Sequence, residues 1–378
     1  MSAPLRAGYK QTEAGVIPED WEATTLGAFL SLQRGHDLTA RERKSGHVPV
    51  MGSAGQNGVH NTAIASAPGI VLGRSGASFG QAHFCDQDFW PHNTALYVTD
   101  FRGNDELFAF YFLKALDFTR HNSGGAQQSL NRNYIYPIQI AVPPLPEQRA
   151  IAAALSDVDA LLAKLDELIA KKRDLKQAAM QQLLTGQTRL PGFSGEWEVK
   201  RLGDITECLD NVRVPLNESQ RNRMRGDFPY CGANGVLDFV NDYVLDDDVI
   251  LMAEDGGYFD EYAYRPIAYR MVGKCWVNNH AHILKAKAGY DQSLLFYLLV
   301  HKNIQSFLAR GTRAKLNKSE MNKIEVNLSL VISEQTAIAT ILSDMDAEIA
   351  ALEARRDKTR GLKQGMMQEL LTGRIRLV

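Results

Sequence analysis

The chain has 378 residues, of which 45% are hydrophobic and 23% are charged, so it can bury two or three domain cores and is not globally disordered. Its formal net charge is only −2, whereas many nucleic-acid-binding proteins are basic. Any contact with nucleic acid must therefore come from local clusters of polar and basic residues.

The cysteines and the N-terminus indicate a reduced, cytoplasmic protein. The four cysteines, at positions 85, 208, 231 and 275, are too widely spaced for a Cys-x-x-Cys zinc site or a disulfide-rich secreted fold. The first fifteen residues lack the apolar core of a signal peptide. No apolar run approaches the ~20 residues that span a bilayer. We expect a soluble chain without membrane contact.

The first globular segment, residues 1–142, has the pattern of a mixed α and β domain. Short strands bounded by turn residues are predicted within 69–84, 94–100 and 135–143, and an apolar helix within 106–118. The second globular segment, residues 191–330, repeats this pattern. Strands are predicted within 248–259 and 323–331, and a helix within 291–308. The predicted fold class is therefore α+β.

A long helix is predicted after each globular segment. Glu147 to Leu184 contains no Gly or Pro, and Gly186 follows as a natural stop. At ~1.5 Å per residue the helix would be ~57 Å long. A coiled-coil seam is formed by Leu155, Val158, Leu162, Leu165 and Ile169, and in the second helix by Leu342, Met345, Ile349 and Leu352. Lys172 and Lys176 interrupt the first seam, and Arg356 and Lys363 the second. We expect the two helices to pair antiparallel as a stalk that separates the globular segments. The alternative is a helical hairpin inside one ordinary domain.

The chain is an internal repeat. Residues 146–190 match residues 333–377 at 25 of 45 positions, which excludes chance. The globular segments match only weakly, for example Trp21, Leu26 and Gly27 with Trp197, Leu202 and Gly203. The predicted organisation is a globular segment at 1–142, a helical spacer at 143–190, a second globular segment at 191–330 and a second spacer at 331–378, with approximate two-fold symmetry.

Motifs for catalysis are missing from the sequence. There is no P-loop, no His-Glu-x-x-His, no Asn-Pro-Pro-aromatic run and no Gly-x-Gly-x-x-Gly after a strand. The glycine-rich run at 73–80 can be a phosphate cradle, but such glycines more often permit a hairpin. His83, His92 and His121 occur singly and are expected to be structural or on the surface. We predict no catalytic residue, no metal ligand and no cofactor in this chain.

Two equivalent polar loops are the first candidates for DNA contact. Each follows the helix of its globular segment and precedes the last strand, and the alternative is a solvated loop. Lys and Arg would neutralise phosphates, while Asn and Gln can make bidentate contacts to adenine. The predicted residues are Gln127, Gln128, Asn131 and Arg132 in the first loop, and Arg310, Arg313, Lys315, Asn317 and Lys318 in the second.

A second candidate pair has opposite charge in the two copies. Arg74 and Ser75 align with Glu254 and Asp255. Arginine suits the acceptor edge of guanine, and a carboxylate suits the amino group of cytosine. Two modules with different half-sites would differ in this way, although plain surface drift is an equal alternative. Arg34 is a further phosphate candidate, and Arg221, Arg223 and Arg225 are weaker ones.

The arrangement resembles the specificity subunits of type I restriction–modification systems over essentially the whole chain. The resemblance is carried by residues 9–21, 143–162, 175–190 and 195–205, and by the final helix with Leu-Leu-Thr-Gly at 370–373. The Leu-Pro-Glu-Gln motif that links the first globular segment to its helix is specific, and the second copy departs from it with Ile332-Ser333.

The resemblance implies a non-catalytic DNA-recognition subunit. Each globular segment would be a target-recognition domain for one half of a split, asymmetric double-stranded DNA site. The helices would set the gap and dock two methyltransferase subunits, which bind S-adenosylmethionine and methylate adenine. Restriction subunits that use ATP and Mg could join the complex.

Two other functions fit the same residues. A pseudo-dimeric scaffold would join partner proteins through its helices without DNA recognition, and it would show no footprint on any duplex in the assembled complex. An enzyme with an unrecognised site would transfer methyl groups or cleave DNA as the purified chain alone. A specific DNA reader differs from both because its affinity falls steeply as salt rises.

Overall fold

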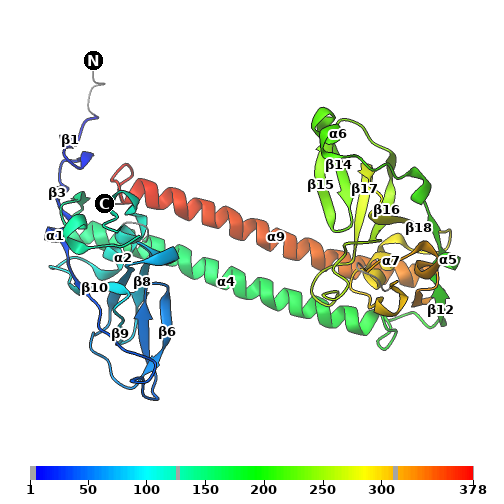
Figure 1. Cartoon of the computed structure of the whole chain (residues 1–378), viewed down its shortest axis with the longest axis horizontal. Helices are drawn as coiled ribbons and strands as arrows, with labels where there is room; N and C mark the ends of the chain where they lie inside the picture. Colours follow the sequence, from blue (N-terminus) through cyan, green and yellow to red (C-terminus); the bar gives the residue numbers. More distant parts are fainter. Residues whose placement is uncertain (1–5, 125–127, 310–313, 378) are drawn as a thin grey trace. The chain divides into compact units, whose positions relative to one another are not determined.

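The computed structural model describes residues 6–124, 128–309 and 314–377. The chain divides into two compact units: unit 1 comprises residues 1–166 and 354–378, and unit 2 comprises residues 167–353. Each unit combines one globular segment with parts of both long helices (Figure 1). Within the described ranges, no helix is long and apolar enough to cross a membrane.

Unit 1 is built on small sheets whose strands pair antiparallel, except that β5 and β9 are parallel. A four-stranded sheet has the order β4-β10-β7-β8, and a three-stranded sheet has the order β6-β5-β9. β1 pairs with β2, and β3 with β11. The strands are β1 (Tyr9–Thr12), β2 (Gly15–Pro18), β3 (Glu22–Thr25), β4 (Ser31–Arg34), β5 (Val48–Gly52), β6 (Gly55–His60), β7 (Gly69–Gly73), β8 (Ala82–Cys85), β9 (Trp90–Pro91), β10 (Ala95–Asp100) and β11 (Gln139–Val142). The helices of the globular segment are α1 (Leu26–Phe29), α2 (Glu106–Ala115) and α3 (Arg132–Ile135), with one-turn helices η1 (Gly76–Ser78) and η2 (Thr119–His121).

Unit 2 repeats this plan with one larger sheet. Its six-stranded sheet has the order β13-β18-β16-β17-β14-β15, and β12 pairs with β19. The strands are β12 (Trp197–Arg201), β13 (Thr206–Cys208), β14 (Arg225–Gly232), β15 (Gly235–Val240), β16 (Leu245–Ala253), β17 (Ala268–Val277), β18 (Ala281–Ala286) and β19 (Glu325–Ser329). The helices are α5 (Leu202–Ile205), α6 (Glu218–Arg223), α7 (Gln292–Leu299) and α8 (Lys318–Met321), with η3 (Asp210–Val212) and η4 (Gln305–Phe307).

The two globular segments share one strand order, although their sequences match only weakly. The order β4-β10-β7-β8 corresponds to β13-β18-β16-β17. In unit 1 the path from β8 to β9 is broken between Cys85 and Trp90, whereas β17 runs unbroken to Val277 and pairs in parallel with β14. In unit 2 the continuous strand β17 therefore belongs to a single six-stranded sheet, whereas the equivalent strands β8 and β9 of unit 1 belong to two separate sheets. The α+β prediction is confirmed.

The predicted helix at 291–308 is shorter in the structure. α7 ends at Leu299, because the carbonyl of Val300 accepts a hydrogen bond from the backbone of Ile267 and the chain turns toward the sheet. Only the single turn η4 follows. The predicted helix at 106–118 likewise ends as α2 at Ala115. The buried faces of α2 and α7 form part of each core, as their apolar composition indicated.

The long helices are α4 (Leu145–Leu183) and α9 (Ile332–Leu370), each of 39 residues. Most of the predicted seam is buried, including Leu155, Leu165 and Ile169 in α4 and Leu342 and Ile349 in α9. Within each unit, residues with higher numbers in α4 form ion pairs with residues with lower numbers in α9. The helices therefore pair antiparallel, as predicted (Figure 1).

The basic residues that interrupt each seam form ion pairs between the helices. In unit 1 Lys363 pairs with Asp159, and Arg356 lies 3.4 Å from Asp166. In unit 2 Lys176 pairs with Asp346, and Lys172 lies 2.7 Å from Glu348. Asp159 also accepts a hydrogen bond of 2.8 Å from Tyr111, and Asp346 one of 2.8 Å from Tyr297. These bonds connect each globular segment to its helix pair. The interruptions are therefore part of the helix packing.

A buried glutamate near the start of each long helix fixes that helix to the tail that follows the other one. Glu147 is fully buried and accepts hydrogen bonds from Arg376 at 2.6 Å and from the Trp21 indole at 2.8 Å. Glu334 is also fully buried and accepts two hydrogen bonds from Arg189, at 2.6 and 2.8 Å. We call these two groups the helix-base clamps. Burial of Glu334 acts to raise its pKa, but the hydrogen bonds from Arg189 outweigh this effect and hold the pKa below its usual value.

Substitution of Arg376 by Ala is expected to destabilise unit 1 by about 3–5 kcal/mol, because it leaves the Glu147 carboxylate buried without its cation. Urea unfolding of the full chain measures this loss. Arg374→Ala is the matched control. Arg374 follows the same helix, but its side chain is exposed and its ion pair of 3.4 Å is with the partly exposed Glu369, so its removal leaves no carboxylate buried without a partner. Equal stability of the Arg376→Ala and Arg374→Ala variants would contradict the clamp.

Candidate nucleic-acid interface

In each globular segment the structure brings the predicted loop and the predicted strand end together at one corner. In unit 1, Leu130 donates a backbone hydrogen bond of 2.7 Å to the carbonyl of Arg74, and Ser75 forms a bridge with Ser129. In unit 2, Leu316 donates an equivalent bond of 2.7 Å to Glu254, and Asp255 forms a bridge with Lys315. The loop and the strand end therefore meet in the same way in both copies. We call these sites the first and second corners.

The first corner surrounds a polar cavity of about 560 Å³. Its lining includes Arg34, Arg74, Ser129, Asn131 and Arg132. Arg34 Nε and an Arg74 guanidinium nitrogen each lie 3.4 Å from the same acceptor, the carbonyl oxygen of Asn93. Burial and the neighbouring charge of Arg34 lower the pKa of Arg74. The corner thus concentrates positive charge beside a cavity.

Charges in the second corner are satisfied within the protein. Glu254 is 9% exposed, and its carboxylate contacts Arg213 at 2.5 Å and Lys315 at 2.9 Å. Arg213 also lies 3.3 Å from Asp210. Burial acts to raise the pKa of Glu254, but the hydrogen bonds from Arg213 and Lys315 outweigh it, so the pKa is lowered. This placement favours a supporting role for Glu254 over direct contact with a base.

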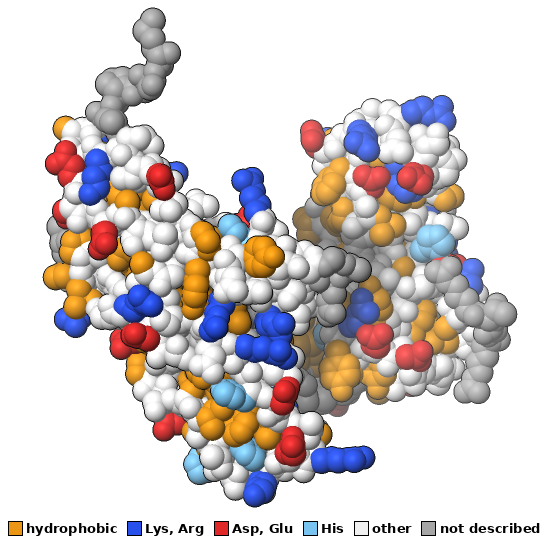
Figure 2. Space-filling model, turned by 60° about the vertical axis from the view of Figure 1, so that its left-hand side comes forward, with side chains coloured by type: hydrophobic (Ala, Val, Ile, Leu, Met, Phe, Trp, Pro, Cys, Tyr) orange, Lys and Arg blue, Asp and Glu red, His pale blue; other side chains and the backbone are white. Residues whose placement is uncertain are grey.

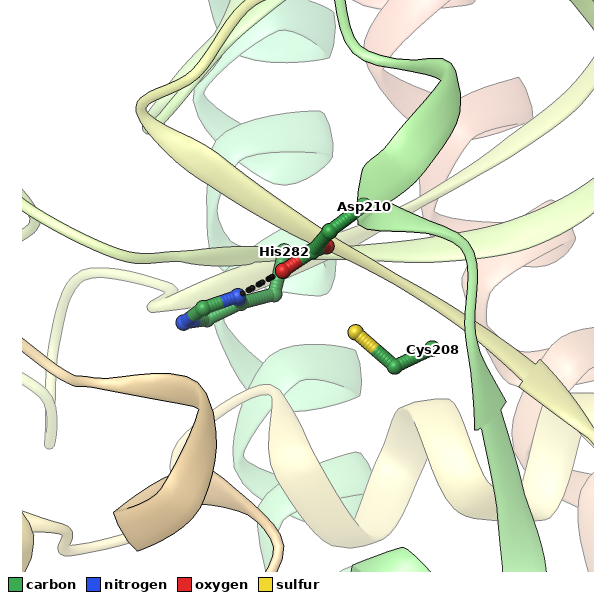
Figure 3. A group of neighbouring side chains, drawn as sticks. All are labelled: Cys208, Asp210 and His282. Carbon is green, nitrogen blue, oxygen red and sulfur yellow. Dashed lines mark hydrogen bonds and ion pairs between the residues drawn. The ribbon is translucent and has the colours of Figure 1, made fainter.

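His282 completes the network of the second corner. It is 1% exposed, and its Nδ1 lies 2.7 Å from Asp210 (Figure 3). Its Nε2 lies 2.8 Å from the carbonyl oxygen of Leu316. Burial acts to lower its pKa, but hydrogen bonds with Asp210, Cys208 and Leu316 raise it to about 9. A protonated His282 therefore holds the loop at Leu316 against the sheet.

Cys208, Asp210 and His282 are also the one group in the described ranges with the spacing of a metal site, since their ligand atoms lie within 4.8 Å of one another (Figure 3). A metal at this site would have to displace the proton that His282 Nδ1 shares with Asp210. With Nε2 directed at a carbonyl oxygen, this imidazole has no lone pair free for proton abstraction. The hydrogen bonds and ion pairs account for the group.

The remaining predicted residues lie around these corners. Arg132 is exposed, begins α3 and donates a 2.9 Å hydrogen bond to the carbonyl of Leu32 in β4. Gln128, Asn317 and Lys318 are exposed, whereas the side-chain oxygen of Asn131 caps α3. Arg221 contacts Asp238 at 3.2 Å on a different part of unit 2. Gln127, Arg310 and Arg313 lie outside the described residues.

Sequence reasoning missed the groups that complete the second corner. Asp210 and Arg213 lie on one segment and His282 on another, each at least 28 residues from Glu254 in the sequence, and only strand pairing brings them to Glu254. One signal was available: Arg34 and Asp210 each come eight residues after the equivalent Leu26 and Leu202. The glycine-rich run at 73–80 forms the connection of the β7-β8 hairpin, in agreement with the hairpin interpretation.

The type I restriction modification DNA specificity domain family matches residues 18–172 and 194–359 of the chain. The chain belongs to this family of DNA specificity subunits. It is thus the non-catalytic DNA specificity subunit of a type I restriction–modification system, with two target-recognition regions in tandem.

Individual relatives agree with this assignment. A putative type I restriction enzyme specificity subunit of Haemophilus influenzae is 34% identical over 159 residues, which cover 42% of this chain and 39% of that protein. The MjaVIII specificity subunit of Methanocaldococcus jannaschii is 22% identical, and the match covers 98% of this chain and 96% of the relative.

Solved structures show the same fold. The S subunit of a type I restriction–modification system from M. genitalium superimposes with a TM-score of 0.66 at 17% identity, over 98% of both chains. A chain from a structure of type I R-M complex assembly and conformational transition gives a TM-score of 0.55 at 14% identity, over 95% of this chain and 99% of that one.

The stability of unit 2 is expected to depend on the ionisation of His282. A raised pKa contributes stability that is complete below pH ~6.5 and is lost as the pH rises through about 9. We expect the free energy of unfolding to fall by about 3 kcal/mol over this window, and His282→Gln to remove most of that dependence. Urea unfolding from pH 6 to pH 10 measures it. Parallel curves for the two proteins would contradict the charged state of His282.

Proposed function

We propose that each target-recognition region reads one half of a bipartite, asymmetric double-stranded DNA site. The recognition regions would lie within residues 1–142 and 191–330, and the spacers within 143–190 and 331–378. The observation that carries this proposal is the pair of corners: one backbone frame, retained in both copies, has side chains of opposite charge at equivalent positions and different exposed loop residues, Gln128, Asn131 and Arg132 in one copy and Lys315, Asn317 and Lys318 in the other. Arg34 and Arg74 of unit 1 occupy the positions equivalent to Asp210 and Glu254 of unit 2. Equivalent frames with different side chains suit two different half-sites.

Contacts to DNA are proposed at the exposed and half-buried residues of both corners. In the first corner these are Arg34, Arg74, Ser75, Gln128, Asn131 and Arg132. In the second corner Lys315, Asn317 and Lys318 are accessible, and Glu254 and Asp255 position them through the bridge and the ion pair to Lys315. Gln127, Arg310 and Arg313 remain candidates from the sequence alone. The face in Figure 2 carries interspersed acidic and basic side chains, which suits contact by local corners.

The helices are proposed to set the gap between the half-sites and to dock two methyltransferase subunits. Leu175 and Leu362 occupy equivalent positions of the repeat and are 47% and 61% exposed. A strongly exposed leucine that recurs at the same position of both helices suits two identical partners on a chain with approximate two-fold symmetry. The methyltransferases would supply S-adenosylmethionine and methylate adenine. Restriction subunits with ATP and Mg would join the same complex, and this chain itself would carry no cofactor.

Exchange of residues 22–142 for the corresponding region of another family member is expected to change one half of the methylated sequence and leave the other half intact. The physical reason is that the first corner and its cavity lie entirely within this exchanged segment. Sequencing that maps methylated adenines in a host carrying the hybrid subunit measures the result. Changes in both halves would contradict modular recognition, and an unchanged pattern would favour a scaffold without DNA recognition.

Substitution of Leu175 and Leu362 by Glu is expected to remove methyltransferase subunits one at a time. Each single variant should retain one of two subunits and the double variant none, because each leucine would anchor one partner. Native mass spectrometry of the co-expressed complex counts them. Leu161→Glu is the matched control: Leu161 is 38% exposed, and its counterpart in the second copy is already Glu348. Full occupancy in the double variant would contradict this surface.

A further inference from the structure

The charged side chains at two equivalent positions have different ion-pair partners in the two units. In unit 2 the anions Asp210 and Glu254 are neutralised by Arg213, Lys315 and His282. In unit 1 the equivalent cations are Arg34 and Arg74, and among the described residues no carboxylate lies within ion-pair distance of either guanidinium. The second corner is electrostatically complete, whereas the first has a surplus of positive charge.

The surroundings of the first corner do not remove this surplus. Asp37 lines the same cavity, but its carboxylate is hydrogen-bonded to the side chain of Asn93. Leu96 occupies the position equivalent to His282, as the strand pairing shows, so the cavity wall there is apolar. Arg132 adds a third guanidinium. The cavity is therefore suited to an anion of its own.

The charge and the donors distinguish a phosphate from a base edge. A guanine edge is neutral, so it would satisfy one arginine and leave the repulsion between Arg34 and Arg74 in place. A backbone phosphate carries a charge and several acceptor oxygens, which two guanidiniums and the adjacent Ser129 hydroxyl can share. The geometry favours the phosphate.

We propose that the first corner binds a single DNA backbone phosphate between Arg34 and Arg74, and that the second corner binds none at the equivalent position. This inference rests on the proposed function, because it names the DNA group that the first corner takes. It assigns Arg34 and Arg74 to positioning the first half-site on the protein. Base discrimination in that half-site then belongs to other residues, such as Gln128 and Asn131.

The test measures duplex binding by the full-length chain in complex with its methyltransferase, over a range of salt concentrations. The Arg34→Gln, Arg74→Gln double variant should bind roughly tenfold more weakly. Its plot of log affinity against log salt should be shallower by about 1, as expected for one lost phosphate contact. Base preferences in both half-sites should stay unchanged. Arg41→Gln is the matched control, because Arg41 is an exposed arginine of the same globular segment that does not line the cavity.

A scan of duplexes with single neutral methylphosphonates locates the phosphate. One position in the first half-site should weaken the wild-type complex and have no further effect on the double variant. If the double variant showed a relaxed base preference with an unchanged salt slope, the phosphate proposal would be wrong and contact with guanine would be favoured. If its affinity were unchanged, the first corner would not contact DNA. In both cases the wild-type complex still binds specifically. Failure of the wild-type complex to prefer any duplex would instead refute the proposed function.

Discussion

The helix-base clamps are the constraint on which both units depend. Glu147 and Glu334 are fully buried carboxylates, and a buried charge without a partner destabilises a fold by several kcal/mol. Each therefore requires the arginine that follows the other long helix, Arg376 or Arg189. Because those arginines come from the opposite copy of the repeat, neither globular segment is complete with its own helix alone. The last residues of the chain are structural parts of unit 1.

The same exchange explains why the helices diverged so little. Lys363 and Lys176 each contact an aspartate of the partner helix, and that aspartate also accepts a hydrogen bond from a tyrosine of the globular segment. A substitution at any of these positions would affect the helix pair and the globular segment together. The identical tail motifs, Leu-Leu-Thr-Gly followed by the clamp arginine, carry the same double requirement.

The corners are free to differ because their frame is held by backbone hydrogen bonds. The bonds from Leu130 to Arg74 and from Leu316 to Glu254 do not depend on the charge of the receiving residue. Side chains can thus change sign while the loop stays in place. In unit 2 this freedom produced a closed network around His282, and in unit 1 it left a cationic cavity.

The sequence by itself determined the repeat, the two long helices and their antiparallel pairing, because these depend on local composition and on a periodic apolar seam. It also located both corners, since each loop lies at the same place in its copy. Only the tertiary structure decided the charge balance within them. Arg213, Asp210 and His282 reach Glu254 through strand pairing between distant segments, and no spacing in the chain reports such contacts. The sequence pattern also did not show that Lys363 and Lys176 are ion-pair partners, because the opposing aspartates lie 204 and 170 residues away in the chain.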